Sequence, residues 1–186
     1  MKTLVALGVL AGLPLLFAAE SGGGKFFPYE YSIDDFPNAL RLVTIRTDNP
    51  NLVALYIVVR TGSRNEVEAG KSGYAHFFEH MMFRGSENYT PDQRDVVLKR
   101  AGASVNAYTS DDRTVYHTLF SKDDLDEIMK LEADRFQRLK YDEASYKTEA
   151  LAVLGEYNKN SANPFRKLSE VLRDTAFEKR TYKHTT

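Results

Sequence analysis

The chain has 186 residues and contains no cysteine and no tryptophan. Without cysteine the fold cannot be held by disulfides, and thiolate is excluded both as a metal ligand and as a nucleophile. A net charge of −1, without a basic run, gives no reason to expect a nucleic-acid partner. A length of 186 residues corresponds to one domain or slightly less than one, and 42% hydrophobic residues are enough to form a hydrophobic core.

Long apolar runs are also scarce, and the one long run in the sequence lies at the N-terminus. It extends from Leu4 to Phe17 behind a single lysine, and small residues follow it. This pattern is typical of a secretory signal peptide, so we expect residues 1–19 to be a signal and residues 20–27 a linker. The protein is then exported, to the periplasm or outside the cell. The alternative is a membrane anchor, but the run is shorter than the roughly 20 residues that span a bilayer, and Pro14 interrupts it. We therefore expect no stable membrane anchor.

Turn signals, apolar periodicity and helix-capping residues divide the rest of the chain into strands and helices. We expect strands at residues 40–47, 52–60, 104–109 and 113–120, and helices at residues 72–84, 91–99, 122–139, 142–159 and 164–177. This order predicts an α+β fold in which helices pack on an antiparallel or mixed sheet. The chain ends at TYKHTT without a capped element, so we expect residues 28–186 to be the N-terminal part of a domain truncated at its C-terminus.

The stretch AHFFEHMMF, residues 75–83, places three ionisable side chains in an otherwise apolar segment that is expected to be buried. On a helix His76, Glu79 and His80 share one face, and histidines at i and i+4 can reach a single Zn²⁺ ion. Burying such groups is costly unless partners or a metal satisfy them. HxxEH is the inverted form of the HExxH metalloprotease helix, with Glu79 placed to accept a proton from water at the metal. Two hydrogen-bonded core histidines are the alternative.

A catalytic zinc needs a third protein ligand, and the segment EALAVLGEYNKN offers two carboxylates. The apolar run at residues 150–154 predicts a helix that is buried at its centre. Glu149 and Glu156 lie on one face of that helix, so one can ligate the metal while the other orients a ligating histidine. The alternatives are a salt bridge between Glu156 and Lys159 and a purely structural Glu149.

These segments resemble the pitrilysin/insulinase family of zinc metallopeptidases, also called inverzincins, whose members include mitochondrial processing peptidase and insulin-degrading enzyme. The resemblance covers roughly residues 28–186, and it is carried by GSRNEVEAGKSGYAHFFEHMMFRGSENYT, GASVNAYTSDDRTVYH and ALAVLGEYNKN. It implies an antiparallel sheet flanked by helices. It also implies a second homologous half, in the same chain or in a partner subunit.

The resemblance further implies a role for each matching residue. His76, His80 and Glu156 would bind one Zn²⁺ per catalytic domain. Glu79 would be the general base, and Glu149 would orient a ligand. The implied protein is a zinc-dependent endopeptidase that hydrolyses extended peptides with a metal-activated water.

Asn106 and Ala107 match the family's edge strand, which pairs with the backbone of a peptide or unfolded polypeptide substrate. In the family the second half supplies an Arg and a Tyr near the scissile bond, and no residue here can be assigned to them. The fragment alone is therefore expected to hold zinc without cleaving at a normal rate.

Three other functions compete with a peptidase. A non-catalytic subunit of the same fold is the main alternative, although such relatives lose residues of the zinc set that this chain retains. A lyase acting on ribosyl-homocysteine, which uses a similar helix, is disfavoured because its chemistry needs a cysteine. A binding domain with a structural zinc normally has four protein ligands, and three good candidates are present.

Overall fold

The computed structural model describes residues 27–68, 70–178 and 181–184. The expected signal peptide (residues 1–19) and almost all of the expected linker (residues 20–27) lie outside these ranges. Contacts divide the chain into two compact units, with the boundary after Asp48. All of the candidate site residues belong to the second unit.

The first unit contains a two-stranded antiparallel sheet. Strand β1 (Tyr31–Asp35) pairs with β2 (Arg41–Ile45), with Tyr31 opposite Ile45 and Asp35 opposite Arg41. The Asp35 carboxylate accepts a hydrogen bond of 2.7 Å from Nε of Arg41, which lowers the pKa of Asp35. Strand β2 lies within the strand expected at residues 40–47, whereas β1 was not expected.

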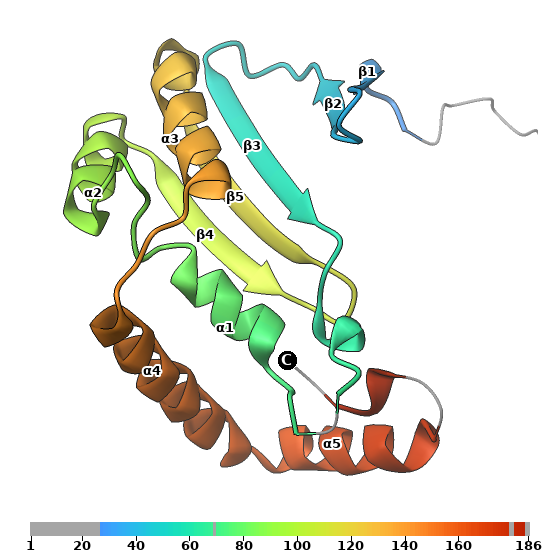
Figure 1. The fold of residues 1–186 in the computed structure, drawn as a ribbon. Helices are drawn as coiled ribbons and strands as arrows, with labels where there is room; N and C mark the ends of the chain where they lie inside the picture. Colours follow the sequence, from blue (N-terminus) through green and yellow to red (C-terminus); the bar gives the residue numbers. More distant parts are fainter. Residues whose placement is uncertain (1–26, 69, 179–180, 185–186) are drawn as a thin grey trace, which may run out of the picture. The chain divides into compact units, whose positions relative to one another are not determined.

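The second unit is built on a three-stranded antiparallel sheet (Figure 1). Strand β5 (Thr114–Ser121) lies in the middle, between β3 (Leu52–Val59) and β4 (Ser104–Thr109). Thr109 faces Thr114 across the β4–β5 hairpin, as the sequence predicts. With helices packed on antiparallel strands, the fold is α+β, and the expected fold class is confirmed.

Five α-helices and three short 3-10 helices are present in the described ranges. They are η1 (Ser63–Asn65), α1 (Tyr74–Met81), α2 (Pro91–Arg100), η2 (Lys122–Asp124), α3 (Leu125–Gln137), α4 (Glu143–Ser161), α5 (Pro164–Ala176) and η3 (Thr181–Lys183). Side-chain capping interactions stabilise the N-termini of several of these helices. Thr90 and Gln93 form a capping box at α2, and the Asp142 and Asn163 side chains accept backbone N–H groups at the starts of α4 and α5.

The core lies where α2 and α3 pack against one face of the sheet. Leu98, Phe120, Ile128 and Leu131 form a buried cluster, and each is at most 6% exposed. Burial of each of these side chains stabilises the fold by about 1.5–3 kcal/mol. Helix α1 contacts β4, β5 and α4, so it lies between the sheet and the helix that follows α3 in the chain (Figure 1).

Two expectations about burial are wrong. The centre of α4 is not buried, because Leu151 is 70% exposed and Leu154 is 53% exposed. Helix α4 touches α1 along one face, and among its described residues Glu149 is the buried one. Helix α1 is only partly buried: Ala75, Glu79 and Met81 are buried, whereas Tyr74 and Phe78 are more than half exposed. An apolar run predicts full burial only where other elements cover all of its faces, and the described residues leave part of both helices uncovered.

No helix in the described ranges has the length and apolar character needed to span a membrane.

Candidate metal centre

Three side chains from two helices meet at one point. Helix α1 supplies His76 and His80, and α4 supplies Glu156. The two histidine Nε2 atoms are 3.3 Å apart. Oε2 of Glu156 lies 3.5 Å from Nε2 of His76 and 3.7 Å from Nε2 of His80.

These separations fit a tetrahedral zinc site. Ligand atoms about 2.1 Å from a tetrahedral Zn²⁺ lie about 3.4 Å from one another, which is close to all three observed distances. Two imidazole nitrogens and one carboxylate oxygen are the donor types of catalytic zinc sites, and three protein donors leave a fourth position open. The residues present therefore fit zinc.

The buried carboxylate of Glu149 lies behind His80. Its Oε2 atom is 2.9 Å from Nδ1 of His80, and its Oε1 atom pairs with the guanidinium of Arg84. The Glu149 residue is 2% exposed, so its charge would be costly without these two partners. If His80 donates its Nδ1 proton to Glu149, the lone pair of Nε2 is free to bind a metal. Sequence reasoning missed Arg84, which lies one helical turn after His80.

The Glu79 side chain is hydrogen-bonded to the sheet, whereas its neighbour His80 is bonded to helix α4. Its Oε2 atom accepts a hydrogen bond of 2.5 Å from the hydroxyl of Thr109, the last residue of β4. Glu79 is 9% exposed and lines the same cavity as His76 and His80. The structure thus brings Glu79 to the edge of the metal site without including it among the three donors.

The start of α1 is held by a carboxylate from the preceding loop. Oε2 and Oε1 of Glu66 accept backbone N–H groups of Gly73 and Ala75, each at 2.7 Å. Gly73 has φ of 90°, a left-handed conformation that suits glycine, and it is the N-cap of α1, which begins two residues after the expected start at residue 72. A negative charge at a helix N-terminus is stabilising, so Glu66 fixes the helix that carries both histidines. Sequence reasoning did not identify this role.

Two buried arginines pack against Phe83, just after the C-terminal end of α1. The guanidiniums of Arg94 and Arg135 lie 5.0 and 5.1 Å from the ring centre of Phe83, just beyond α1. Burial lowers the pKa of Arg94, and the nearby charge of Arg135 acts in the same direction. Both guanidiniums pair with the buried carboxylate of Glu132. Burial also raises the pKa of Tyr116, whose ring lies 6.2 Å from that of Phe83.

A cavity of about 600 Å³ opens over the three donors, and one wall of it is the strand β4. Asn106 and Ala107 both line this cavity, and the Asn106 side chain accepts the backbone N–H of Ala107 at 2.9 Å. Strand β4 is an edge strand of the described sheet, and an edge strand can pair with an extended peptide. Substrate binding by Asn106 and Ala107 stays a prediction.

Comparison with known proteins adds a family to this geometry. The model of the family described as Insulinase (Peptidase family M16) matches residues 41–186. The zinc protease PqqE of Helicobacter pylori is 30% identical over 151 residues, which cover 81% of this chain and 34% of that protein. Subunit 1 of the mitochondrial cytochrome b-c1 complex of Rattus norvegicus is 28% identical over 150 residues, covering 80% of this chain and 31% of its own length.

The same fold is present in a solved structure. The crystal structure of a protease from Helicobacter pylori matches with a TM-score of 0.79 and 30% identity, over 84% of this chain and 38% of that one. The chain spans about a third of the length of the curated relatives it matches. Because the family model covers most of the chain, including all three metal donors, the chain belongs to the insulinase family of peptidases, peptidase family M16.

Proposed function

We propose that this chain carries the zinc-binding half of a metalloendopeptidase that hydrolyses extended peptides. The convergence of His76, His80 and Glu156 at separations suited to one tetrahedral ion carries the proposal. Relatives that are named zinc proteases support it. One zinc ion per catalytic domain would polarise the peptide carbonyl and make a bound water more acidic.

In this proposal each site residue has a separate role in proton transfer, ligand orientation or substrate binding. Glu79 accepts a proton from the attacking water and later returns it to the leaving amine, as a general base and then a general acid. Glu149 orients His80 through the hydrogen bond to Nδ1. The peptide lies along β4, where Asn106 and Ala107 contact its backbone.

We further propose that the protein acts with a second homologous half, in the same chain or in a partner subunit, and that residues 1–19 direct its export. The exposed apolar side chains of α4 support a further layer over this helix, since an apolar face in water is unfavourable.

A non-catalytic subunit of the same fold is the second candidate. The name of the relative from the cytochrome b-c1 complex, which describes a subunit of a complex, favours it. The presence of all three donors and of Glu79 favours the peptidase.

Metal content and hydrolysis of the full-length protein separate the two candidates. The peptidase proposal expects about one zinc per chain and cleavage of an unstructured peptide, both lost on treatment with a chelator and restored by zinc. His76→Ala and Glu156→Ala should each lose zinc, whereas the exposed-site control Lys159→Ala, on the same helix as Glu156, should keep it. A protein that binds zinc without cleaving any of a diverse set of unfolded polypeptides would contradict the peptidase proposal. A protein without zinc would contradict the metal site.

A further inference from the structure

The hydroxyl of Thr109 donates a hydrogen bond to the Glu79 carboxylate. The functions proposed above give this bond no role. Thr109 ends β4, and Glu79 belongs to α1, so the bond joins the candidate substrate strand to the metal helix. Among the described residues Thr109 is the one hydrogen-bond donor to this carboxylate. The bond uses Oε2 of Glu79 and leaves Oε1 available to a water molecule.

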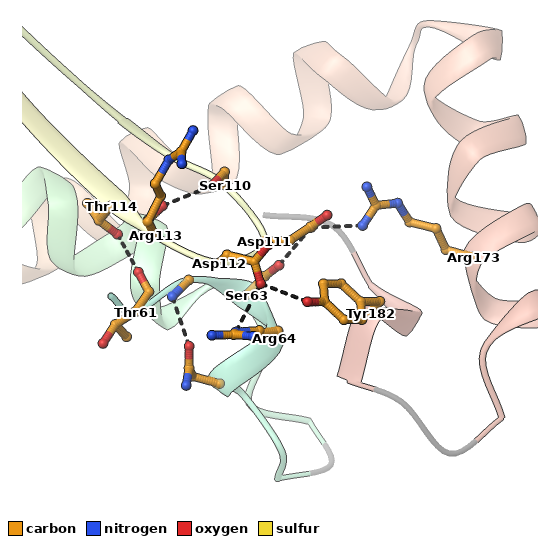
Figure 2. Close-up of polar contacts among 12 residues, drawn as sticks. Thr61, Ser63, Arg64, Ser110, Asp111, Asp112, Arg113, Thr114, Arg173 and Tyr182 are labelled. Carbon is orange, nitrogen blue, oxygen red and sulfur yellow. Dashed lines mark hydrogen bonds and ion pairs between the residues drawn. The ribbon is translucent and has the colours of Figure 1, made fainter. Parts of the chain in front are cut away.

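A second threonine fixes where the Thr109 hydroxyl lies. Oγ1 of Thr114, opposite Thr109 in the hairpin, lies 3.2 Å from Oγ1 of Thr109. Thr114 donates its own proton to the backbone carbonyl of Thr61 at 2.9 Å, a bond drawn in Figure 2. A hydroxyl has one proton to donate, so Thr114 presents lone pairs to Thr109. The Thr109 proton therefore goes to the closer and charged acceptor, Glu79.

The segment around Thr61 is closely packed against the β4–β5 turn. The β4–β5 turn packs tightly on the loop that follows β3, where a Cβ on Gly62 would lie 2.2 Å from the carbonyl oxygen of Ser110. Figure 2 shows Asp111 of this turn bonded to Ser63 and to Arg173. Because the turn is held from several sides, Thr114 and Thr109 have little freedom to move. The Glu79 carboxylate is bonded to Thr109, so its orientation is restricted through that one bond.

We propose that Thr109 is the positioning residue for Glu79, holding one carboxylate oxygen so that the other is aimed at the attacking water. This inference rests on the proposed function, in which Glu79 is the general base. A carboxylate free to rotate would spend less time in the reactive orientation, and small errors of placement are costly in proton transfer. Among the described residues the hydroxyl of Thr109 is bonded to Glu79 and Thr114 and to none of the three candidate metal donors, so its contribution is to the rate of hydrolysis and not to zinc binding.

Thr109→Val in the full-length protein tests the proposal, because valine keeps the branched shape and removes the donor. We expect kcat to fall by about 10–100-fold, with KM within about twofold and zinc content unchanged. Thr109→Ser, which keeps the hydroxyl, should recover most of the rate. Thr175→Val is the matched control, since the hydroxyl of Thr175 bonds to its own helix α5 at the carbonyl of Val171, and it should leave kcat unchanged.

A double variant separates positioning of Glu79 from a general effect on the fold. In a Glu79→Gln background, Thr109→Val should change the residual rate by less than about twofold, because the group it positions is already disabled. A crystal structure of Thr109→Val should show the Glu79 carboxylate turned away from its present orientation. An unchanged kcat in Thr109→Val, a loss of zinc, or an equal loss of rate in both backgrounds would overturn the proposal.

The outcome for Glu79→Gln alone identifies which proposal has failed. If that variant cleaves peptide at the normal rate, the general-base role of Glu79 is wrong and the proposed function fails with it. If it is inactive while Thr109→Val is fully active, the general-base role stands and the positioning role of Thr109 is wrong.

Discussion

His80 and Glu149 are joined by a contact of 2.9 Å between Nδ1 and Oε2, although they lie on different helices and 69 positions apart in the sequence. Glu149 is buried and also pairs with Arg84, so its position is fixed independently of any metal. Helix α4 therefore reaches the site twice, once behind His80 and once, through Glu156, in front of it.

Replacing the buried carboxylate should weaken the metal site without removing a ligand. We expect Glu149→Gln to lower zinc affinity by about 10–100-fold, because the neutral amide supports His80 less well and leaves Arg84 without its partner. Competition with a chelator of known affinity measures this. Glu143→Gln is the control, since Glu143 is 80% exposed at the start of the same helix and pairs with Lys147. Equal affinities for the two variants would exclude an orienting role for Glu149.

Replacing Glu79, the proposed general base, should leave zinc binding intact and lower the rate of hydrolysis. Glu79→Gln is expected to retain zinc and to lower kcat by about 10²–10⁴-fold, since proton transfer is lost while the three donors remain. Metal analysis and peptide hydrolysis on the same sample check both halves of the expectation. Glu87→Gln, at a 60% exposed side chain shortly after α1, should behave like the wild type.

Removing the Glu66 carboxylate, which accepts two backbone N–H groups at the start of α1, should destabilise the helix that carries the histidines. Glu66→Gln is expected to lower the free energy of unfolding by about 0.5–2 kcal/mol, because the amide has one acceptor oxygen for two backbone donors and no charge. Hydrogen exchange at residues 73–77 should accelerate. The exposed Glu68→Gln is the matched control in the same loop, and equal exchange rates in the two variants would argue against the cap.

Acid should weaken the contact between the β4–β5 turn and α5. A hydrogen bond from Arg173 lowers the pKa of Asp111, against the effect of partial burial, and Ser63 also contributes (Figure 2). Since the folded pKa lies below the unfolded value of about 3.9, the ion pair stabilises the protein above that pH. This stability is lost as pH falls through the folded pKa.

Asp111→Asn should therefore reduce the difference in thermal midpoint between pH 7 and pH 3. The effect should be modest, because the two side chains are 28% and 29% exposed and water screens the pair. Arg173→Gln should reduce the same difference by removing the partner instead. If both variants keep the full pH dependence of the wild type, other groups control the acid transition.

The elements nearest the site could be predicted because each has a strong local signal. The boundaries of α2 and β4 follow from Pro91 at the first turn and from the break at Ala101–Ala103. The grouping of His76, His80 and Glu79 on one face follows from helical geometry alone. Strand β1 was missed because its sequence, YSIDD, is short and ends in two aspartates, a residue type that is depleted in strands.

Contacts between distant segments could not be read from local patterns. The strands at residues 41–45 and 52–59 are joined by a turn, yet the first pairs with β1 and the second with β5. The choice of partner depends on the packing of the whole sheet. The Thr109–Glu79 bond spans 30 positions, and no spacing rule points to it. The exposed centre of α4 shows the converse error, where a strong local signal was taken to guarantee a covering layer.

The split origin of the three donors has a consequence for assembly. His80 and Glu156 are separated by β4, β5, α2 and α3, so an ion held by both closes a long loop of the chain. Closing a long loop restricts the unfolded chain more than the folded one, in the same way as a covalent cross-link. The ion would then act as a removable cross-link between α1 and α4, and a chelator would loosen the packing of these two helices while leaving the three-stranded sheet in place.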